Sequence, residues 1–148
     1  MKKIDKYDVR TDLFYDPINH FWLDIKEGKV VIGMSPLVQE TSGSFVAIQF
    51  EDTGKSINKD ESFGTAEAEK HVGPLKAPVS GKILIKNESV VENPRLINTD
   101  PYGQGWLVEI ELGDFENEKS ALIGGEEEIT KWFEDELKKF DEKGWIAH

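Results

Sequence analysis

The chain of 148 residues contains no cysteine. Disulfide scaffolds, thiol nucleophiles and cysteine-ligated metal sites are therefore excluded, and any redox chemistry must come from an attached group. No apolar run approaches the ~20 residues of a membrane-spanning helix. Residues 1–8 carry early acidic side chains and lack the apolar segment of a secretory signal, and they do not resemble a transit peptide. We therefore expect a soluble, cytoplasmic protein.

Basic side chains are scarce, with 18 Lys and Arg against 29 Asp and Glu, which gives a formal net charge of -11. Such a chain repels phosphate backbones and anionic lipids, so neither nucleic acid nor membrane partners are expected. The excess charge favours solubility over an acidic docking face for a basic partner, and the second interpretation stays open. A hydrophobic content of 38% is enough for one ordinary core, so we expect a single domain and a monomer.

Short segments with alternating apolar and polar side chains dominate the middle of the chain. The clearest runs from Trp106 to Leu112, where the even positions are apolar and Glu109 and Glu111 lie between them. Further strands are expected at residues 29–32, 45–50 and 82–86, the last followed by a polar turn at 87–89. Closely spaced strands broken by glycine and proline turns favour an antiparallel sandwich or flattened barrel.

Helical signals are of two kinds. Ser35-Pro36 predicts a short helix that Gly43 ends, and Asn93-Pro94 predicts another over residues 95–97. After Gly125, three glutamates followed by apolar residues at helical spacing predict an amphipathic C-terminal helix of about four turns. Packing against the sheet explains its apolar stripe better than a partner groove does; the stripe comprises Ile129, Trp132, Phe133, Leu137 and Phe140.

Two motifs of catalytic loops are incomplete in this sequence. Thr-Gly-Lys-Ser at residues 53–56 ends like a phosphate-binding loop, but Gln49 occupies the place of its first glycine. Ser80 lies before a glycine, but Pro78 stands where a nucleophile elbow needs another. Nucleotide binding and serine hydrolysis are therefore not expected.

Histidines and paired acids give no enzyme site either. His20, His71 and His148 are widely scattered and lack the spacing of a metal motif, so no metal site is expected. Glu67 and Glu69 could serve acid/base catalysis, but alternation along a strand makes solvated side chains the better interpretation. We therefore expect no catalytic residue in this chain.

Residues 63–81 are the most informative segment. Glu67 stands three residues before Lys70, and Ala-Pro-Val-Ser-Gly follows at residues 77–81. This string resembles the lipoylation hairpin of the glycine cleavage H-protein family. The likeness extends to His20-Phe21-Trp22, to Ile-Gly-Met-Ser at 32–35, and to an Asn-Pro, Leu-Ile-Asn and Pro-Tyr-Gly-Gln-Gly-Trp block at 93–107, and it covers about residues 14–112.

The resemblance implies an all-β, lipoyl-domain-like flattened barrel, or barrel-sandwich hybrid, with Lys70 on a hairpin and a C-terminal helix outside. Residues 1–148 would form one lipoyl-carrier domain, with a core over about 14–112 and a helical extension over about 113–148. It implies covalent lipoic acid on Lys70, recognition of the hairpin by a lipoate ligase through Glu67, and Glu69 and His71 flanking the arm. The chain would be a non-catalytic carrier that also meets a dihydrolipoamide dehydrogenase or similar oxidoreductase.

The sequence departs from the family where glycine-cleavage members hold their cationic aminomethyl cargo with carboxylates. Phe21 and Pro74 replace two acids, and Thr41 replaces a common histidine. Lys-His-Val-Gly-Pro at 70–74 resembles H-like lipoate-binding proteins associated with sulfur oxidation by heterodisulfide-reductase-like complexes. We therefore predict a carrier for sulfur oxidation. A true glycine-cleavage carrier and an unmodified interaction module on the same fold remain the alternatives.

Overall fold

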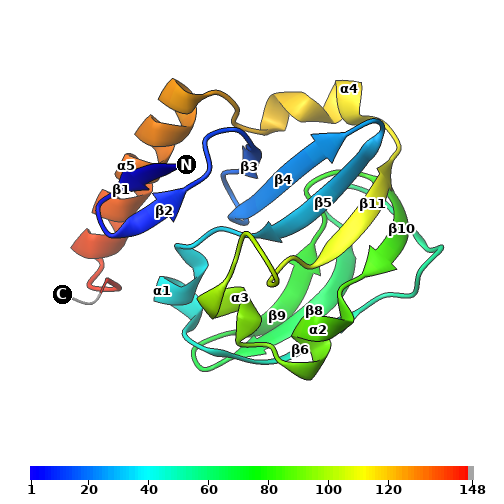
Figure 1. Ribbon diagram of the computed structural model, residues 1–148, viewed down its shortest axis with the longest axis horizontal. Helices are drawn as coiled ribbons and strands as arrows, with labels where there is room; N and C mark the ends of the chain where they lie inside the picture. The colour runs from blue at the N-terminus through cyan, green and yellow to red at the C-terminus, as the bar shows by residue number, and fades with distance from the viewer. Residues whose placement is uncertain (147–148) are drawn as a thin grey trace.

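The computed structural model describes residues 1–146, and its main body is a flattened barrel of two antiparallel sheets (Figure 1). The larger sheet has the order β3-β4-β5-β11-β10-β7, and the smaller has the order β6-β8-β9. The strands of the larger sheet are β3 (Phe14–Asp16), β4 (Phe21–Lys26), β5 (Lys29–Met34), β11 (Val108–Leu112), β10 (Gly81–Lys86) and β7 (Ser56–Ile57). Those of the smaller sheet are β6 (Phe45–Phe50), β8 (Ser62–Ala68) and β9 (Val72–Lys76). This architecture confirms the predicted all-β class.

The core lies between the two sheets because their strands alternate apolar and polar side chains. Leu23, Ile32, Ile83 and Ile110 of the larger sheet are fully buried, as is Phe63 of the smaller one. They belong to one continuous apolar cluster. Burial of one face of each strand fixes the register, since a slip of one residue would expose the whole apolar set.

The first residues of the predicted strand at 106–112 are not part of it. β11 begins at Val108, and the carbonyl of Leu107 just before it accepts from the amide of Asn87. The Nδ2 of Asn87 also donates to the carbonyl of Trp106, at 2.6 Å. The side chain of Trp106 packs against a second apolar cluster, which includes Trp22 and Tyr102. It does not join Val108 in the core between the two sheets.

Three short helices connect the strands: α1 (Val38–Ser42), α2 (Glu88–Glu92) and α3 (Leu96–Thr99). α1 starts later than Ser35-Pro36 predicted, and Gly43 ends it as expected. The polar turn predicted at 87–89 is wrong. Asn87 caps α2 there by accepting from the amide of Ser89 at 3.0 Å, which is the usual role of an asparagine at a helix start.

The C-terminal helix α5 (Glu126–Glu142) lies outside the barrel, beside an N-terminal hairpin of β1 (Lys2–Ile4) and β2 (Tyr7–Val9) (Figure 1). Ile129 and Phe133 are fully buried, so the predicted packing of the apolar stripe is confirmed. The hairpin and the short α4 (Phe115–Glu118) and η1 (Lys119–Ala121) were not predicted. Hairpin and helix together enclose the second apolar cluster.

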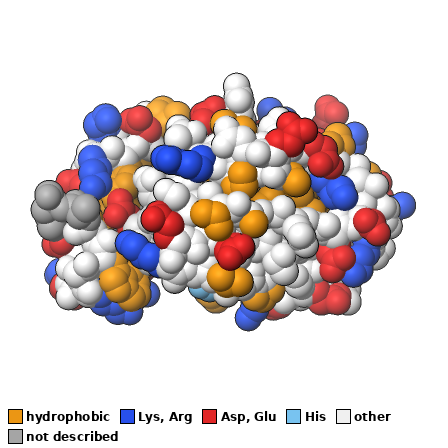
Figure 2. Space-filling model, turned by 90° about the horizontal axis from the view of Figure 1, so that it is seen from below, with side chains coloured by type: hydrophobic (Ala, Val, Ile, Leu, Met, Phe, Trp, Pro, Cys, Tyr) orange, Lys and Arg blue, Asp and Glu red, His pale blue; other side chains and the backbone are white. Residues whose placement is uncertain are grey.

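Charged side chains of both signs are interspersed on the face shown in Figure 2, with small apolar patches between them. This face therefore presents no continuous basic surface. Within residues 1–146, no helix combines the length and apolar character that crossing a membrane requires.

Candidate functional site

Lys70 occupies the tip of the β8–β9 hairpin, and the backbone of this tip is held by the loop after α1. The amide of Lys70 donates to the carbonyl of Ser42 at 2.9 Å, and the amide of Glu69 donates to the carbonyl of Ser44 at 3.1 Å. In return, the amide of Ser44 donates to Oε1 of Glu69 at 2.7 Å. Lys70 itself is exposed and makes no ion pair with any residue in 1–146. The tip thus combines a fixed backbone with a free ammonium group.

Asn98 of α3 holds that supporting loop in turn. Its Oδ1 accepts from the amide of Phe45, and its Nδ2 donates to the carbonyl of Gly43, both at 3.0 Å. One side chain therefore connects α3 to the segment that carries the hairpin tip. This role of Asn98 was not predicted from the sequence, although Asn98 lies in the Leu-Ile-Asn part of the family-like block.

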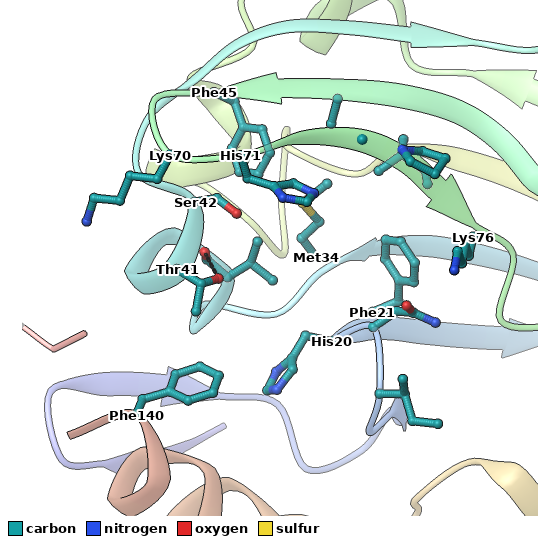
Figure 3. Close-up of a pocket in the computed structure, with 17 residues that line it drawn as sticks. His20, Phe21, Met34, Thr41, Ser42, Phe45, Lys70, His71, Lys76 and Phe140 are labelled. Atoms are coloured by element: carbon teal, nitrogen blue, oxygen red, sulfur yellow. Dashed lines mark hydrogen bonds between the residues drawn. The ribbon is translucent and has the colours of Figure 1, made fainter. Parts of the chain in front are cut away.

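A cavity of about 330 Å³ opens beside the hairpin. Figure 3 shows Lys70 pointing away from it and the His71 ring pointing into it, toward Met34. Its apolar wall and its polar groups come from β4, β5, α1, β6, β9 and α5, segments far apart in the sequence. The apolar side chains are Ile18, Phe21, Met34, Val38, Phe45, Ala66, Pro74, Leu75 and Phe140, and the polar ones are Asn19, His20, Thr41, Ser42, Lys70, His71 and Lys76.

No aspartate or glutamate of residues 1–146 lines this cavity. One carboxylate reaches the cavity indirectly: Oε1 of Glu136 lies 2.8 Å from Nε2 of His20, and His20 lines the cavity. Nδ1 of His20 lies 3.1 Å from Oγ of Ser35, and the ring packs against Trp132 and Phe140. Burial lowers the pKa of His20, and the hydrogen bond that Glu136 accepts from its ring opposes this shift.

The structure brings two of the scattered histidines, His20 and His71, to the same cavity. Their distance in the sequence gave no sign of this, because the fold closes β9 toward the start of β4. No group of three metal-binding side chains exists among residues 1–146, so the two form no metal site with a third described ligand. His148 lies outside the described residues.

The two predicted glutamates point elsewhere. Glu67 is exposed on β8, between the buried Ala66 and Ala68, and therefore faces away from the core. Glu69 is also exposed, and its hydrogen bond from the amide of Ser44 lowers the pKa of its carboxyl group. Neither side chain lines the cavity. Glu67 is available to a partner, whereas Glu69 stabilises the hairpin tip.

All three positions at which the sequence departs from the resembled family line the same cavity. Phe21, Thr41 and Pro74 contribute a buried aromatic ring, a hydroxyl group and an imino ring to its wall. The hydroxyl of Thr41 donates to the carbonyl of Val38 at 3.0 Å. The departures therefore change the chemistry of one cavity together.

Comparisons with known proteins point to one family. The family model described as glycine cleavage H-protein matches residues 13–136. A glycine cleavage system H protein 2 of Aquifex aeolicus is 31% identical over 96% of this chain and 88% of its own length. A glycine cleavage system H protein of Herpetosiphon aurantiacus is 37% identical over 89% of this chain and 98% of its own length. The crystal structure of a glycine cleavage system H protein from Mycobacterium marinum superposes with a TM-score of 0.65 at 34% identity, covering 72% of this chain and 90% of that one.

Proposed function

Because this chain belongs to the glycine cleavage H-protein family, we propose that Lys70 carries its lipoyl group. Members of this family are non-catalytic carriers with lipoate bound covalently to a lysine, and the chain is a lipoyl carrier of that type. The observation that supports Lys70 is its place at a fixed, exposed hairpin tip beside a cavity. A ligase can hold such a tip, and the rigid backbone defines where the arm begins.

The chemistry at Lys70 is amide formation between its Nζ and the lipoyl carboxyl group. The amide removes the charge of the lysine and gives this cysteine-free chain a dithiolane, which supplies two-electron redox chemistry. We propose that a lipoate ligase recognises the exposed Glu67, with Glu69 and His71 flanking the arm. A dihydrolipoamide dehydrogenase or similar oxidoreductase would reoxidise it.

We test the attachment site by co-producing the chain with a lipoate ligase and measuring intact mass. Lys70→Arg keeps the positive charge but should abolish the lipoyl increment, whereas Lys82→Arg, an exposed lysine on β10, should keep it. Retention of the increment in Lys70→Arg would refute the site. If the chain is an unmodified interaction module, it should show no lipoyl mass increment. Lys70→Ala should then reduce its activity only slightly.

For the cargo, we propose a sulfur species handed to a heterodisulfide-reductase-like complex. The support is the cavity without a carboxylate, because a cationic aminomethyl group needs an opposite charge when it leaves water. Phe21 and Pro74, which replace the family's acids, both line that cavity. The aromatic face of Phe21 offers only a weak cation–π contact in exchange.

The second candidate is the carrier of aminomethyl groups in glycine cleavage, with the glycine cleavage enzymes as partners. The names of the relatives favour it. One contact in this chain also favours it, since Glu136 reaches the cavity through His20. The two candidates differ in the charge of the cargo that the arm must hold.

Incubation of the lipoylated chain with glycine and an authentic glycine decarboxylase separates the two candidates. The sulfur proposal predicts the lipoyl increment without any further adduct. A stable methylamine adduct that depends on Lys70 would place the chain in glycine cleavage and refute the sulfur proposal.

A further inference from the structure

Lys76 lies where two cavities meet. The second cavity, of about 170 Å³, shares Ile18, Asn19 and Lys76 with the first and continues past them toward Lys59 and Pro78. Figure 3 places Lys70 and Lys76 at opposite sides of the first cavity, with His71, Met34 and Phe21 between them. Lys70 lies just before β9 and Lys76 ends it, so β9 runs along both cavities from the hairpin tip to the second cavity.

The ammonium group of Lys76 has no acidic side chain bound directly to it among the described residues. Lys76 is exposed and makes no ion pair with any residue in 1–146. Two acids also line the second cavity, and both bind groups other than Lys76. Asp60 pairs with Lys59 at 3.3 Å, and the buried Asp16 accepts from the amides of Ile18 and Asn19 and from the side-chain amide of Asn19.

The reach of a lipoyl arm on Lys70 matches the position of Lys76. A lipoyl-lysine side chain extends ~14 Å from its Cα by standard bond lengths. A strand advances roughly 3.3 Å per residue, so an arm laid along β9 from Lys70 ends about four residues on, near Pro74 and Leu75. A group bonded to a terminal sulfur would then stand at the level of Lys76, between the two cavities.

We propose that Lys76 determines cargo specificity by pairing with an anionic group at the outer end of the cargo. This inference rests on the proposed arm at Lys70 and adds a charge preference to it. No carboxylate of residues 1–146 lines the first cavity, and once Lys70 is acylated Lys76 is its one remaining lysine. Lys76 therefore gives the far end of this cavity a preference for anions over cations. The anion is a carboxylate or a sulfur oxyanion, both of which an ammonium group binds as a point charge.

Four derivatives of the lipoylated protein test the preference. Reduction followed by iodoacetate, iodoacetamide or bromoethylamine caps the thiols with carboxymethyl, carbamidomethyl or aminoethyl groups, which are anionic, neutral and cationic. Sulfite gives the fourth: it attacks one sulfur of the oxidised ring, the S–S bond breaks, one sulfur becomes an S-sulfonate and the other leaves as a thiolate. The docked fraction of each is read from the amide NMR shifts of Gly73 and Leu75, relative to the uncapped lipoyl protein.

In the wild-type chain, the anionic caps should dock about two- to fivefold better than the neutral one, as for a partly exposed ion pair, and the cationic cap worst. Lys76→Gln should abolish this difference, whereas Lys82→Gln, an exposed strand lysine outside both cavities, should keep it. Added salt should weaken the preference. Docking of both anions indicates any anionic cargo, and docking of the S-sulfonate alone indicates an oxyanion.

Equal docking of the anionic and neutral caps, preference for the aminoethyl cap, or a preference that survives in Lys76→Gln would overturn the inference. These outcomes leave the arm at Lys70 intact, because docking itself still occurs. If no cap changes the amide shifts of Gly73 and Leu75 although the mass shows lipoylation, the arm does not lie in the cavity. The inference about Lys76 is then refuted as well. If Lys70 takes no lipoyl group, the proposed function fails first.

Discussion

Trp22 shows what the family-like blocks do at the scale of single residues. Its indole lies over Gly33, the residue opposite it on β5, and its Nε1 donates to the carbonyl of Pro101 at 3.0 Å. Its ring also packs against Tyr102, with centroids 5.9 Å apart. Three blocks that are far apart in the sequence thus meet at one side chain, which indicates that their contacts with Trp22 stabilise the fold.

Gly33 tests this packing directly. A Cβ at position 33 would overlap the indole of Trp22, so Gly33→Ala should lower the free energy of unfolding by about 1–3 kcal/mol. Urea denaturation measures the change. In a Trp22→Phe background the same substitution should cost less, because the smaller ring leaves room. An equal cost in both backgrounds would show that the indole is not the cause.

His20 makes the stability depend on pH. Burial lowers its pKa below 6.5, so the folded chain binds a proton less readily than the unfolded chain does. The stability that depends on neutral His20 is therefore complete above pH 6.5 and is lost as the pH falls below that value. Glu136 and Asp16 oppose the shift and Lys139 adds to it, all more weakly than burial does.

Denaturation midpoints between pH 7 and pH 5 test this dependence. The wild-type chain should lose stability across this window, and His20→Asn should lose less. Asparagine suits the position because His20 has a φ of 60°, in the left-handed region that asparagine tolerates. The carboxyl groups whose pKa is lowered, on Asp12 and Glu69, titrate below the window. The same loss in both chains would assign the pH dependence to other groups.

At the scale of elements, α3 matters because Asn98 ties it to the loop that supports the hairpin tip. Asn98→Ala leaves the amide of Phe45 and the carbonyl of Gly43 without these partners. We expect a loss of about 1–3 kcal/mol in unfolding free energy and faster hydrogen exchange at the Phe45 amide. We also expect slower lipoylation at Lys70, because the hairpin tip would spend less time in the conformation that the ligase binds.

The matched control is Asn87→Ala, which removes the cap of α2 and the bonds to the loop before β11. It should destabilise the chain by a comparable amount without slowing lipoylation by the ligase. Equal slowing in both variants would mean that lipoylation follows overall stability and not the position of the tip.

The helices and strands also show which elements the periodicity of the sequence could predict. Strong alternation or helical spacing correctly predicted β5, β6, β10 and α5, because each buries one face. Asn87 was misjudged although an asparagine before a helix is a local capping signal. Trp106 was misjudged because its carbonyl accepts from the side chain of Asn87, 19 residues away, and no local pattern reveals such a bond. The strands β1 and β2 were missed because each has only three residues.

At the scale of the whole molecule, the proposed attachment lysine could be inferred from local sequence, whereas the cavity beside it could not. Lys70 lies in a continuous motif of residues 63–81, which a resemblance can identify. The cavity combines His20, Thr41, His71 and Phe140, which come together only when the barrel closes and α5 docks beside it. The absence of a carboxylate in its described lining follows from that assembly, since the replaced acids belong to separate segments.

The most direct measurement is peptide mapping by mass spectrometry of the protein isolated from its own cells. If Lys70 carries the arm, the lipoyl increment appears on the peptide that contains Lys70 and on no other lysine. A lipoyl group on a different lysine, or an unmodified Lys70 in cells that lipoylate other proteins, would contradict it.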